Sequence, residues 1–307
     1  MQVPLHQSID PAHPTAHCAW CGVPLDATAE TLPGRKRCSR CGVATTYPWP
    51  SDAELEAAYD EWYRPPTGRF LGFGDAILRR TRGRLARRID RIAPPGPVLD
   101  VGAGDGALLD ALAARGREVL GLERASDRPD VRAAEISEID GRFAAIVFWH
   151  SLEHLRNPAD QLARAAERLD THGVLLVAVP NAASLQSRAF GDRWFAGDLP
   201  RHLVHVSAAA LIERLREVDL TVERVSYWRG GQVLFGWVHG LVGALPPHLD
   251  LYDAIRRGEA QQQPLSRSER FAALALGVMF APAAVLAAAG EVIAGRGGTV
   301  YIEARRG

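Results

Sequence analysis

Short apolar runs alternate with amphipathic segments through the C-terminal two-thirds of the chain. The runs predict strands at 97–101, 118–122, 144–149, 173–179, 221–228 and 299–304, with a short strand near 131–134. Helices are expected between the strands, including 107–114 and 207–218. Alternation of this kind predicts an α/β fold, in which a parallel sheet carries helices on both faces.

The first third of the chain has a different pattern. Ser51 or Asp52 caps a predicted helix that runs to about Tyr63 and ends before two prolines. A second helix is predicted at 75–92, with an apolar stripe on one side and seven arginines on the other. We interpret the arginines as an exposed basic face, and contact with phosphates or anionic lipid is the alternative.

Composition limits the class of protein. The chain has 307 residues, 47% of them hydrophobic, and a formal net charge of zero, which is typical of a globular protein. A neutral chain gives no support for bulk attraction to nucleic acid. No basic start is followed by an apolar core, so we expect no signal peptide and a cytoplasmic location.

Four cysteines are confined to one short window. Cys18 and Cys21 form one C-x2-C knuckle, and Cys38 and Cys41 form a second one sixteen residues later. Two such knuckles complete a tetrahedral thiolate site, so the spacing predicts a structural zinc ion. We therefore expect a disordered tail at 1–16 and a zinc ribbon at 17–48. A docking surface on the ribbon is an alternative role.

A glycine-rich turn follows the first predicted strand of the α/β region. Asp100 precedes Gly102, Gly104 and Gly106, and a predicted helix begins directly afterwards. No lysine follows the glycines, which argues against a phosphate loop, and the spacing departs from that of dinucleotide folds. S-adenosylmethionine fits better, because Asp100 can hold its ammonium group and Glu123, at the end of the next strand, can accept both ribose hydroxyls.

These motifs resemble those of the class I S-adenosylmethionine-dependent methyltransferases. The glycine turn looks like the first motif of that family, Phe148–Leu155 like the segment after its fourth strand, and 172–181 like its fifth strand. The resemblance implies a Rossmann-like, doubly wound, mostly parallel seven-stranded sheet whose last strand is antiparallel. It also implies cofactor contacts at Trp149 and His150, and a helical lid at 49–95.

The lid and the acceptor side contribute further candidates. The resemblance implies that Tyr59 of the lid contacts the cofactor and that Tyr63 lies near the sulfonium or the substrate. The segment 193–207 is similar to that of deoxysugar C-methyltransferases, which pair a four-cysteine module with this core. In that family an acid precedes the histidine proposed as base, whereas here Arg201 precedes His202 and would suit an anionic substrate.

The histidines His202, His154 and His205 are thus candidate bases for a methyltransferase acting on a sugar, glycoconjugate or natural-product intermediate. A methyltransferase acting on a lipid-linked substrate at the membrane surface is the alternative, and a nucleic-acid methyltransferase and a non-catalytic zinc-ribbon binding module are the competing hypotheses. His150 and His154 also match the zinc-peptidase pattern H-x-x-E-H, but the pattern follows a predicted strand and lacks the continuous helix that this chemistry needs. Between Glu123 and Ala144 the chain is short, and Glu135 is a weak candidate for an adenine contact.

The predicted domain at 96–307 is interrupted by an apolar insertion at 229–297. It contains 233–245, which is largely apolar, and 271–290, twenty residues without a charge. By length alone the second stretch could span a bilayer. Both ends must return to one sheet, so we expect buried or homodimeric packing, a substrate lid, or a hairpin lying on a membrane.

Overall fold

The computed structural model describes residues 17–59, 68–72, 74–228 and 231–306, so the predictions for the tail at 1–16 and for Tyr63 lie outside the described residues. Its centre is a seven-stranded sheet of order β10-β11-β8-β7-β4-β5-β6. The strands are β4 (Val98–Val101), β5 (Val119–Leu122), β6 (Val131–Arg132), β7 (Phe143–Trp149), β8 (Leu169–Pro180), β10 (Leu220–Ser226) and β11 (Thr299–Arg306). β11 is antiparallel to both of its neighbours and the other pairs are parallel, which confirms the predicted fold class.

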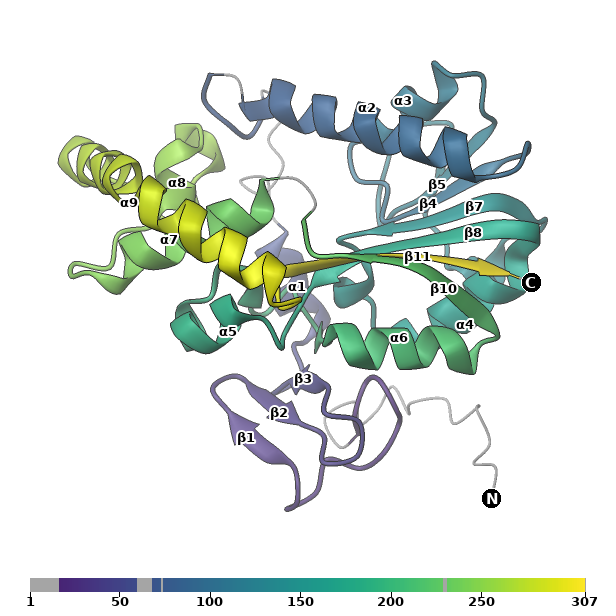
Figure 1. The fold of residues 1–307 in the computed structure, drawn as a ribbon, viewed down its shortest axis with the longest axis horizontal. Coiled ribbons are helices and arrows are strands. Elements are labelled where there is room, and N and C mark those ends of the chain that lie inside the picture. Colours follow the sequence, from purple (N-terminus) through teal and green to yellow (C-terminus); the bar gives the residue numbers. More distant parts are fainter. Residues whose placement is uncertain (1–16, 60–67, 73, 229–230, 307) are drawn as a thin grey trace.

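Helices cover both faces of the sheet. In Figure 1, α2 (Gly74–Ile92) and α3 (Ala107–Ala113) lie above it, and α4 (Pro158–Arg168) and α6 (Ala208–Glu217) lie below it. Val98 of β4 packs in one core cluster with residues of α2, whereas Leu99 and Val101 belong to the cluster on the opposite face. Burial on both faces explains why the central strands are continuous apolar runs.

The segment between β5 and β7 is short, as the sequence predicts. β6 has only two residues, and a single 3-10 helix, Ile136–Glu138, lies between it and β7 in this fully described stretch. Glu135 caps that helix and accepts a hydrogen bond from Gln161 of α4 at 3.2 Å. The chain therefore crosses the end of the sheet with very little covering structure.

The cysteine module is joined to the central domain by a second sheet. β1 (Glu30–Leu32), β2 (Arg35–Arg37) and β3 (Ala44–Thr46) form an antiparallel ribbon, to which β9 (Val204–His205) adds a fourth strand. Ala44 pairs with His205 and Thr45 with Val204. The strand that directly follows His202 is thus held by the ribbon, a connection that the sequence does not reveal.

The described part of the insertion, 231–297, contains three α-helices: α7 (Gln232–Ala244), α8 (Leu251–Ile255) and α9 (Arg267–Ile293). Figure 1 shows them beyond the carboxyl ends of the parallel strands. Buried Glu291 anchors α9, because its carboxylate accepts hydrogen bonds at 2.9 Å from the backbone and side chain of Gln186, in α5 (Leu185–Phe190), and from Trp237 of α7. α1 (Asp52–Ala58), capped by Ser51 as predicted, lies near the same end of the sheet.

Candidate active site

Asp100 lies at the end of β4 under the glycine turn. Its side chain is buried, and Oδ1 has no hydrogen-bond partner among the described residues. Burial raises the pKa of Asp100 to about 7, and the charge of Arg82 offsets part of this rise. A buried carboxylate without a donor is a site that a cationic group, such as the ammonium of an amino acid, would complete.

The glycine turn needs the conformations that only glycine adopts without strain. Gly102, Gly104 and Gly106 have φ of +79°, +63° and +74°. A Cβ at Gly102 would also collide with the side chain of Ser151, whose hydroxyl donates to the carbonyl of Val101. The turn is therefore pressed against the segment that follows β7.

Glu123 lies over this turn from the end of β5. Its Oε2 accepts a hydrogen bond from the Gly104 N–H at 2.9 Å, and its Oε1 accepts from the Arg124 N–H at 3.0 Å. Asp100 and Glu123, the two carboxylates predicted to bind S-adenosylmethionine, thus flank one glycine turn. This arrangement suits a ligand that carries both a cationic group and a vicinal diol.

A second group of polar side chains follows β7 in the 3-10 helix Leu152–His154. The hydroxyl of Tyr59 is 2.8 Å from Nδ1 of His154, and the same nitrogen is 2.9 Å from the carbonyl oxygen of Arg201. A carbonyl only accepts, so Nδ1 carries the proton and Nε2 has a lone pair. Burial lowers the pKa of His154 to about 4, and nearby His202 adds to this effect, so the ring is neutral at pH 7.

His202 faces His154, with ring centroids 4.6 Å apart. Its Nδ1 is 3.0 Å from the carbonyl oxygen of Ala196 and donates to it, which leaves a lone pair on Nε2. That Nε2 is 3.9 Å from Oε1 of Glu153 and 3.7 Å from Oδ2 of Asp198. Two carboxylates therefore flank the nitrogen that can accept a proton.

Glu153 is the most deeply buried acid of this group, with 2% of its surface exposed. Neither carboxylate oxygen has a hydrogen-bond partner among the described residues, and Nδ1 of His150 is 3.4 Å from Oε1. Burial alone would raise the pKa of Glu153, but the three surrounding histidines hold it below its usual range. The carboxylate is therefore charged and would stabilise a positive charge on a neighbouring imidazole.

Arg201 is predicted from the sequence to face an anionic substrate, but its guanidinium is bound by groups of the chain itself. Its guanidinium forms two hydrogen bonds with the Asp198 carboxylate and a third with the carbonyl of Ala58 at 3.2 Å, and it is buried. These contacts engage Arg201 within the chain, so the structure does not favour the suggestion that it receives an anionic substrate. Besides Glu153, the acid beside His202 is Asp198, four residues earlier in the loop, where a search for an adjacent acid–histidine pair does not find it.

The remaining predicted residues lie around these two groups. His205 packs between the ribbon and the loop, with Nε2 3.1 Å from Oγ1 of Thr46, and that hydroxyl donates to the His202 carbonyl at 2.6 Å. Trp149 packs against Tyr301, and His150 has a φ of +54° at the end of β7. Tyr59 contacts His154 through its hydroxyl, and the guanidinium of Arg124, next to Glu123, lies 4.9 Å from the centre of the tyrosine ring.

Residues 77–225, just under half of the chain, match a family model described as a methyltransferase domain. These residues therefore form a methyltransferase domain. The match spans β4 to β10, including the glycine turn and both polar groups. It ends before the apolar insertion.

Solved structures similar to this methyltransferase include an S-adenosylmethionine-dependent methyltransferase from Archaeoglobus fulgidus, at 17% identity over 74% of this chain and 94% of that one, with a TM-score of 0.47. The mycolic acid cyclopropane synthase CmaA1 is 15% identical over 82% and 95% of the two chains, with a TM-score of 0.47. CalS10, an amino pentose methyltransferase from Micromonospora echinaspora, is 26% identical over 34% and 54%, with a TM-score of 0.29. No match was found among curated protein sequences.

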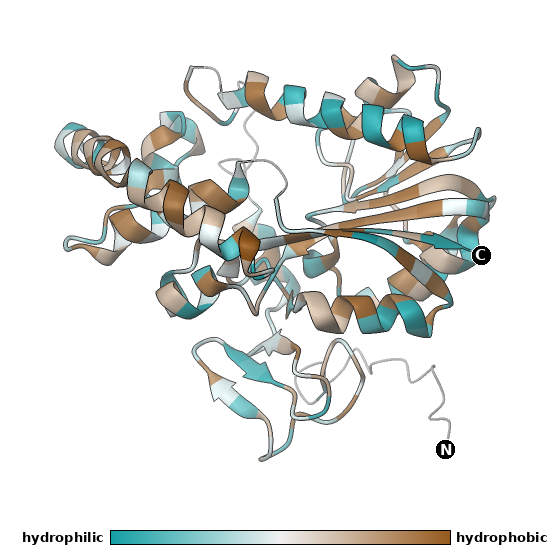
Figure 2. Cartoon of the chain, viewed as in Figure 1, coloured by the Kyte–Doolittle hydropathy of each residue, from teal (hydrophilic) through white to brown (hydrophobic). Residues whose placement is uncertain are grey.

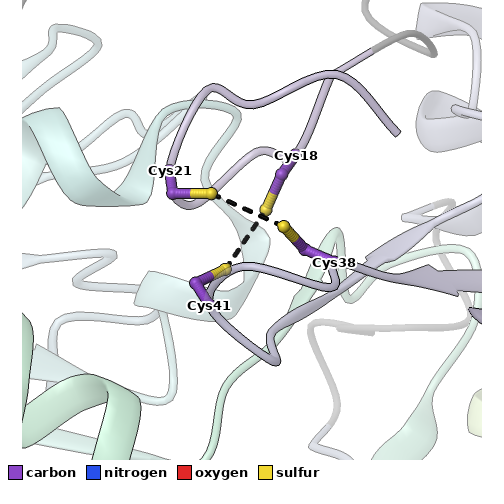
Figure 3. Close-up of side chains that lie close together, drawn as sticks. All are labelled: Cys18, Cys21, Cys38 and Cys41. Atoms are coloured by element: carbon purple, nitrogen blue, oxygen red, sulfur yellow. Dashed lines mark hydrogen bonds between the residues drawn. The ribbon is translucent and has the colours of Figure 1, made fainter. Parts of the chain in front are cut away.

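The four cysteines of the methyltransferase converge on one point (Figure 3). The sulfur of Cys18 is 3.6 Å from that of Cys41, and the sulfur of Cys21 is 3.7 Å from that of Cys38. Zinc–sulfur bonds of about 2.3 Å in a tetrahedron place the sulfurs about 3.8 Å apart, so the set fits a zinc ion.

A second candidate metal set is Glu153, His154 and His202, whose ligand atoms lie within 4.8 Å of one another. His150 is not part of it, so the pairing of His150 with His154 that the peptidase pattern requires is not formed. The same three side chains can alternatively relay a proton, since each histidine has a lone pair on Nε2.

Proposed function

We propose that this methyltransferase transfers the methyl group of S-adenosylmethionine to a small molecule, with a sugar, glycoconjugate or natural-product intermediate as the acceptor and His202 as the general base. The carrying observation is the proximity of two groups at the carboxyl ends of the strands. One group, made up of Asp100, Glu123 and the glycine turn, is suited to bind the methyl donor. The other group, made up of Glu153, His154 and His202, is suited to accept the proton that the methyl acceptor loses. The segment 149–154 links them, because Ser151 packs on Gly102.

S-adenosylmethionine, when bound, supplies an electrophilic methyl group on a positively charged sulfur. Asp100 would hold the ammonium group and Glu123 the ribose hydroxyls. During transfer of this methyl group to the acceptor, Nε2 of His202 would accept the proton that the acceptor loses. Glu153 and Asp198 stabilise the resulting imidazolium, since both carboxylates lie within 4 Å of that nitrogen.

His202 is preferred over the other two candidate bases because of its neighbours. His154 has one carboxylate and a second imidazole beside it, and burial holds its pKa at about 4. His205 is engaged with Thr46 of the ribbon. Tyr59 and His154 would then orient the acceptor, because a hydroxyl and an imidazole lone pair both bind the hydroxyl groups of a sugar.

We further propose a structural zinc ion at Cys18, Cys21, Cys38 and Cys41. With four protein thiolates such a site is closed to substrate, so the metal would act only through the fold. The ribbon carries β3, which pairs with β9, and Thr46 of β3 binds the carbonyl of His202. By stabilising the ribbon, the zinc ion would thus help to fix the position of His202 without contacting it.

The test is a comparison of His202→Ala with His172→Asn, a substitution of an exposed histidine at the start of β8 that also has a positive φ. Each variant is titrated with S-adenosylmethionine in a calorimeter and then incubated with labelled donor and fractionated extract. We expect wild-type donor affinity in both variants, and loss of labelled product only in His202→Ala. Product formation by His202→Ala would exclude His202 as the base, and a flat titration of the wild type would favour a binding module without methyltransferase activity.

A further inference from the structure

The long helix of the insertion has an unusual surface. Apolar side chains project into solvent along almost its entire length, and Phe271, Val278, Leu286 and Ile293 are 75%, 77%, 74% and 86% exposed. Leu274, Met279 and Val285 are also exposed, and no charged residue occurs between Arg270 and Glu291. At 1.5 Å per residue, the stripe from Phe271 to Ile293 is about 34 Å long. We name these seven side chains the α9 stripe.

We infer that the α9 stripe docks this methyltransferase onto the surface of an anionic lipid bilayer. By length and composition alone α9 could cross a membrane. Its opposite face, however, is packed on the protein: Ala273, Gly277, Ala284 and Ala288 are buried, and Leu251 of α8 lies over Gly277. Glu291 is hydrogen-bonded to α5 and α7, and β11 begins at Thr299. A helix held along one side can lie in the interface but cannot span it.

The charge near the stripe favours lipid over a second copy of the chain. The start of α2 is attached to the insertion, because the Leu71 N–H donates to the carbonyl of Ile255 at 3.0 Å. Ile77 and Leu78 are exposed in the first turns of α2. Five exposed arginines follow on the same helix, and none forms an ion pair with a described residue: Arg79, Arg80, Arg84, Arg87 and Arg91.

Figure 2 shows the start of this helix toward the insertion with its largely apolar α9, whereas the later turns of α2 lie over the sheet. Exposed arginines attract anionic headgroups, whereas two copies of the chain in contact there would bring like charges together. An apolar stripe near a basic helix is thus complementary to an anionic bilayer surface.

Docking through α9 also bears on the acceptor, a point that rests on the proposed function. Phe195, in the loop that leads to His202, packs against Phe235 of α7 and Tyr252 of α8, each at a ring distance of 5.0 Å. The insertion therefore contacts the acceptor side of the site. A bilayer on α9 would favour a polar group carried on a lipid as the acceptor.

The experiment measures flotation of the full chain, without donor or acceptor, with vesicles of phosphatidylcholine alone or with phosphatidylglycerol added. The variants are Val278→Gln/Leu286→Gln on the stripe, Arg79→Gln/Arg80→Gln in the first turns of α2, and Val225→Gln as a control on the exposed sheet edge. Calorimetric titration with S-adenosylmethionine verifies that each variant is folded, and light scattering gives its oligomeric state.

We expect the wild type and Val225→Gln to float with the anionic vesicles. The stripe variant should bind them at least tenfold less, and the arginine variant should lose the preference for phosphatidylglycerol. A wild type that floats with neither vesicle overturns the inference, as does a dimer that the stripe substitutions dissociate. Flotation needs no turnover, so the two proposals can fail separately. Membrane docking can be absent while methyl transfer is retained, and methyl transfer can be absent while docking is retained.

Discussion

Replacing Asp100 by asparagine should stabilise the ligand-free methyltransferase at alkaline pH and weaken its affinity for S-adenosylmethionine. The pKa of Asp100 rises from 3.8 to about 7 on folding, because burial disfavours the charged form. Because the pKa of Asp100 is higher in the folded state than in the unfolded state, the contribution of Asp100 to the free energy of unfolding is complete below pH 4. This contribution is lost as the pH rises through 7. The difference between the two values corresponds to about 4 kcal/mol. Asparagine cannot ionise, so Asp100→Asn should be more stable than the wild type by up to this amount at pH 8.

Urea unfolding at pH 4 and pH 8 measures the stability difference, and calorimetry measures donor affinity. Asp105→Asn, in the same turn but exposed, is the matched control. Loss of the carboxylate removes a hydrogen bond to a charged group, worth about 1.5–3 kcal/mol, so affinity should fall roughly 10- to 150-fold. Equal stability of Asp100→Asn and wild type at pH 8, or unchanged affinity for S-adenosylmethionine, would refute the assignment of Asp100 as a buried carboxylate that binds the cationic group of the donor.

Two further predictions concern the ribbon and the base. Elemental analysis should find one zinc ion per chain, lost in Cys38→Ser; a second divalent ion would assign a metal to Glu153, His154 and His202 and would remove His202 as the base. Thr46→Val should lower turnover and cost about 1–3 kcal/mol in stability, because the buried carbonyl of His202 loses its donor. Donor affinity measured by calorimetry should stay unchanged in Thr46→Val, and a parallel loss of donor affinity would contradict a role confined to the acceptor loop.

The grouping of the residues that we propose for the methyl donor could be predicted because they are local in the sequence. Asp100 and the three glycines lie within seven consecutive residues, and Glu123 ends the next strand, which pairs with β4 in parallel. Carboxyl ends of adjacent parallel strands meet at one edge of the sheet, so the alternation of strands and helices already brings these residues together. The two cysteine knuckles are equally local, and the spacing of the cysteines already predicts that their sulfurs converge on one point.

The acceptor half could be predicted only as separate candidates. His154 and His202 are both named by the sequence as possible bases, but their contact depends on the packing of the loop before β9 against the turn after β7. Tyr59 reaches His154 across 95 positions in the chain. The strand β9 has only two residues, which is too short for a periodic pattern in the sequence. Its pairing partner, β3, belongs to the distant ribbon, so the pairing could not be predicted either.

The sequence by itself determined the sheet, the glycine turn and the four-cysteine cluster, because hydrophobic period, glycine conformation and ligand spacing act over short stretches of chain. Only the tertiary structure decided that Asp198 and Glu153 are the acids beside His202, that Arg201 is engaged within the chain, and that α9 leaves its apolar side uncovered. Those outcomes depend on which surfaces meet when distant segments pack. The composition of a segment does not record which of its faces the rest of the chain will cover.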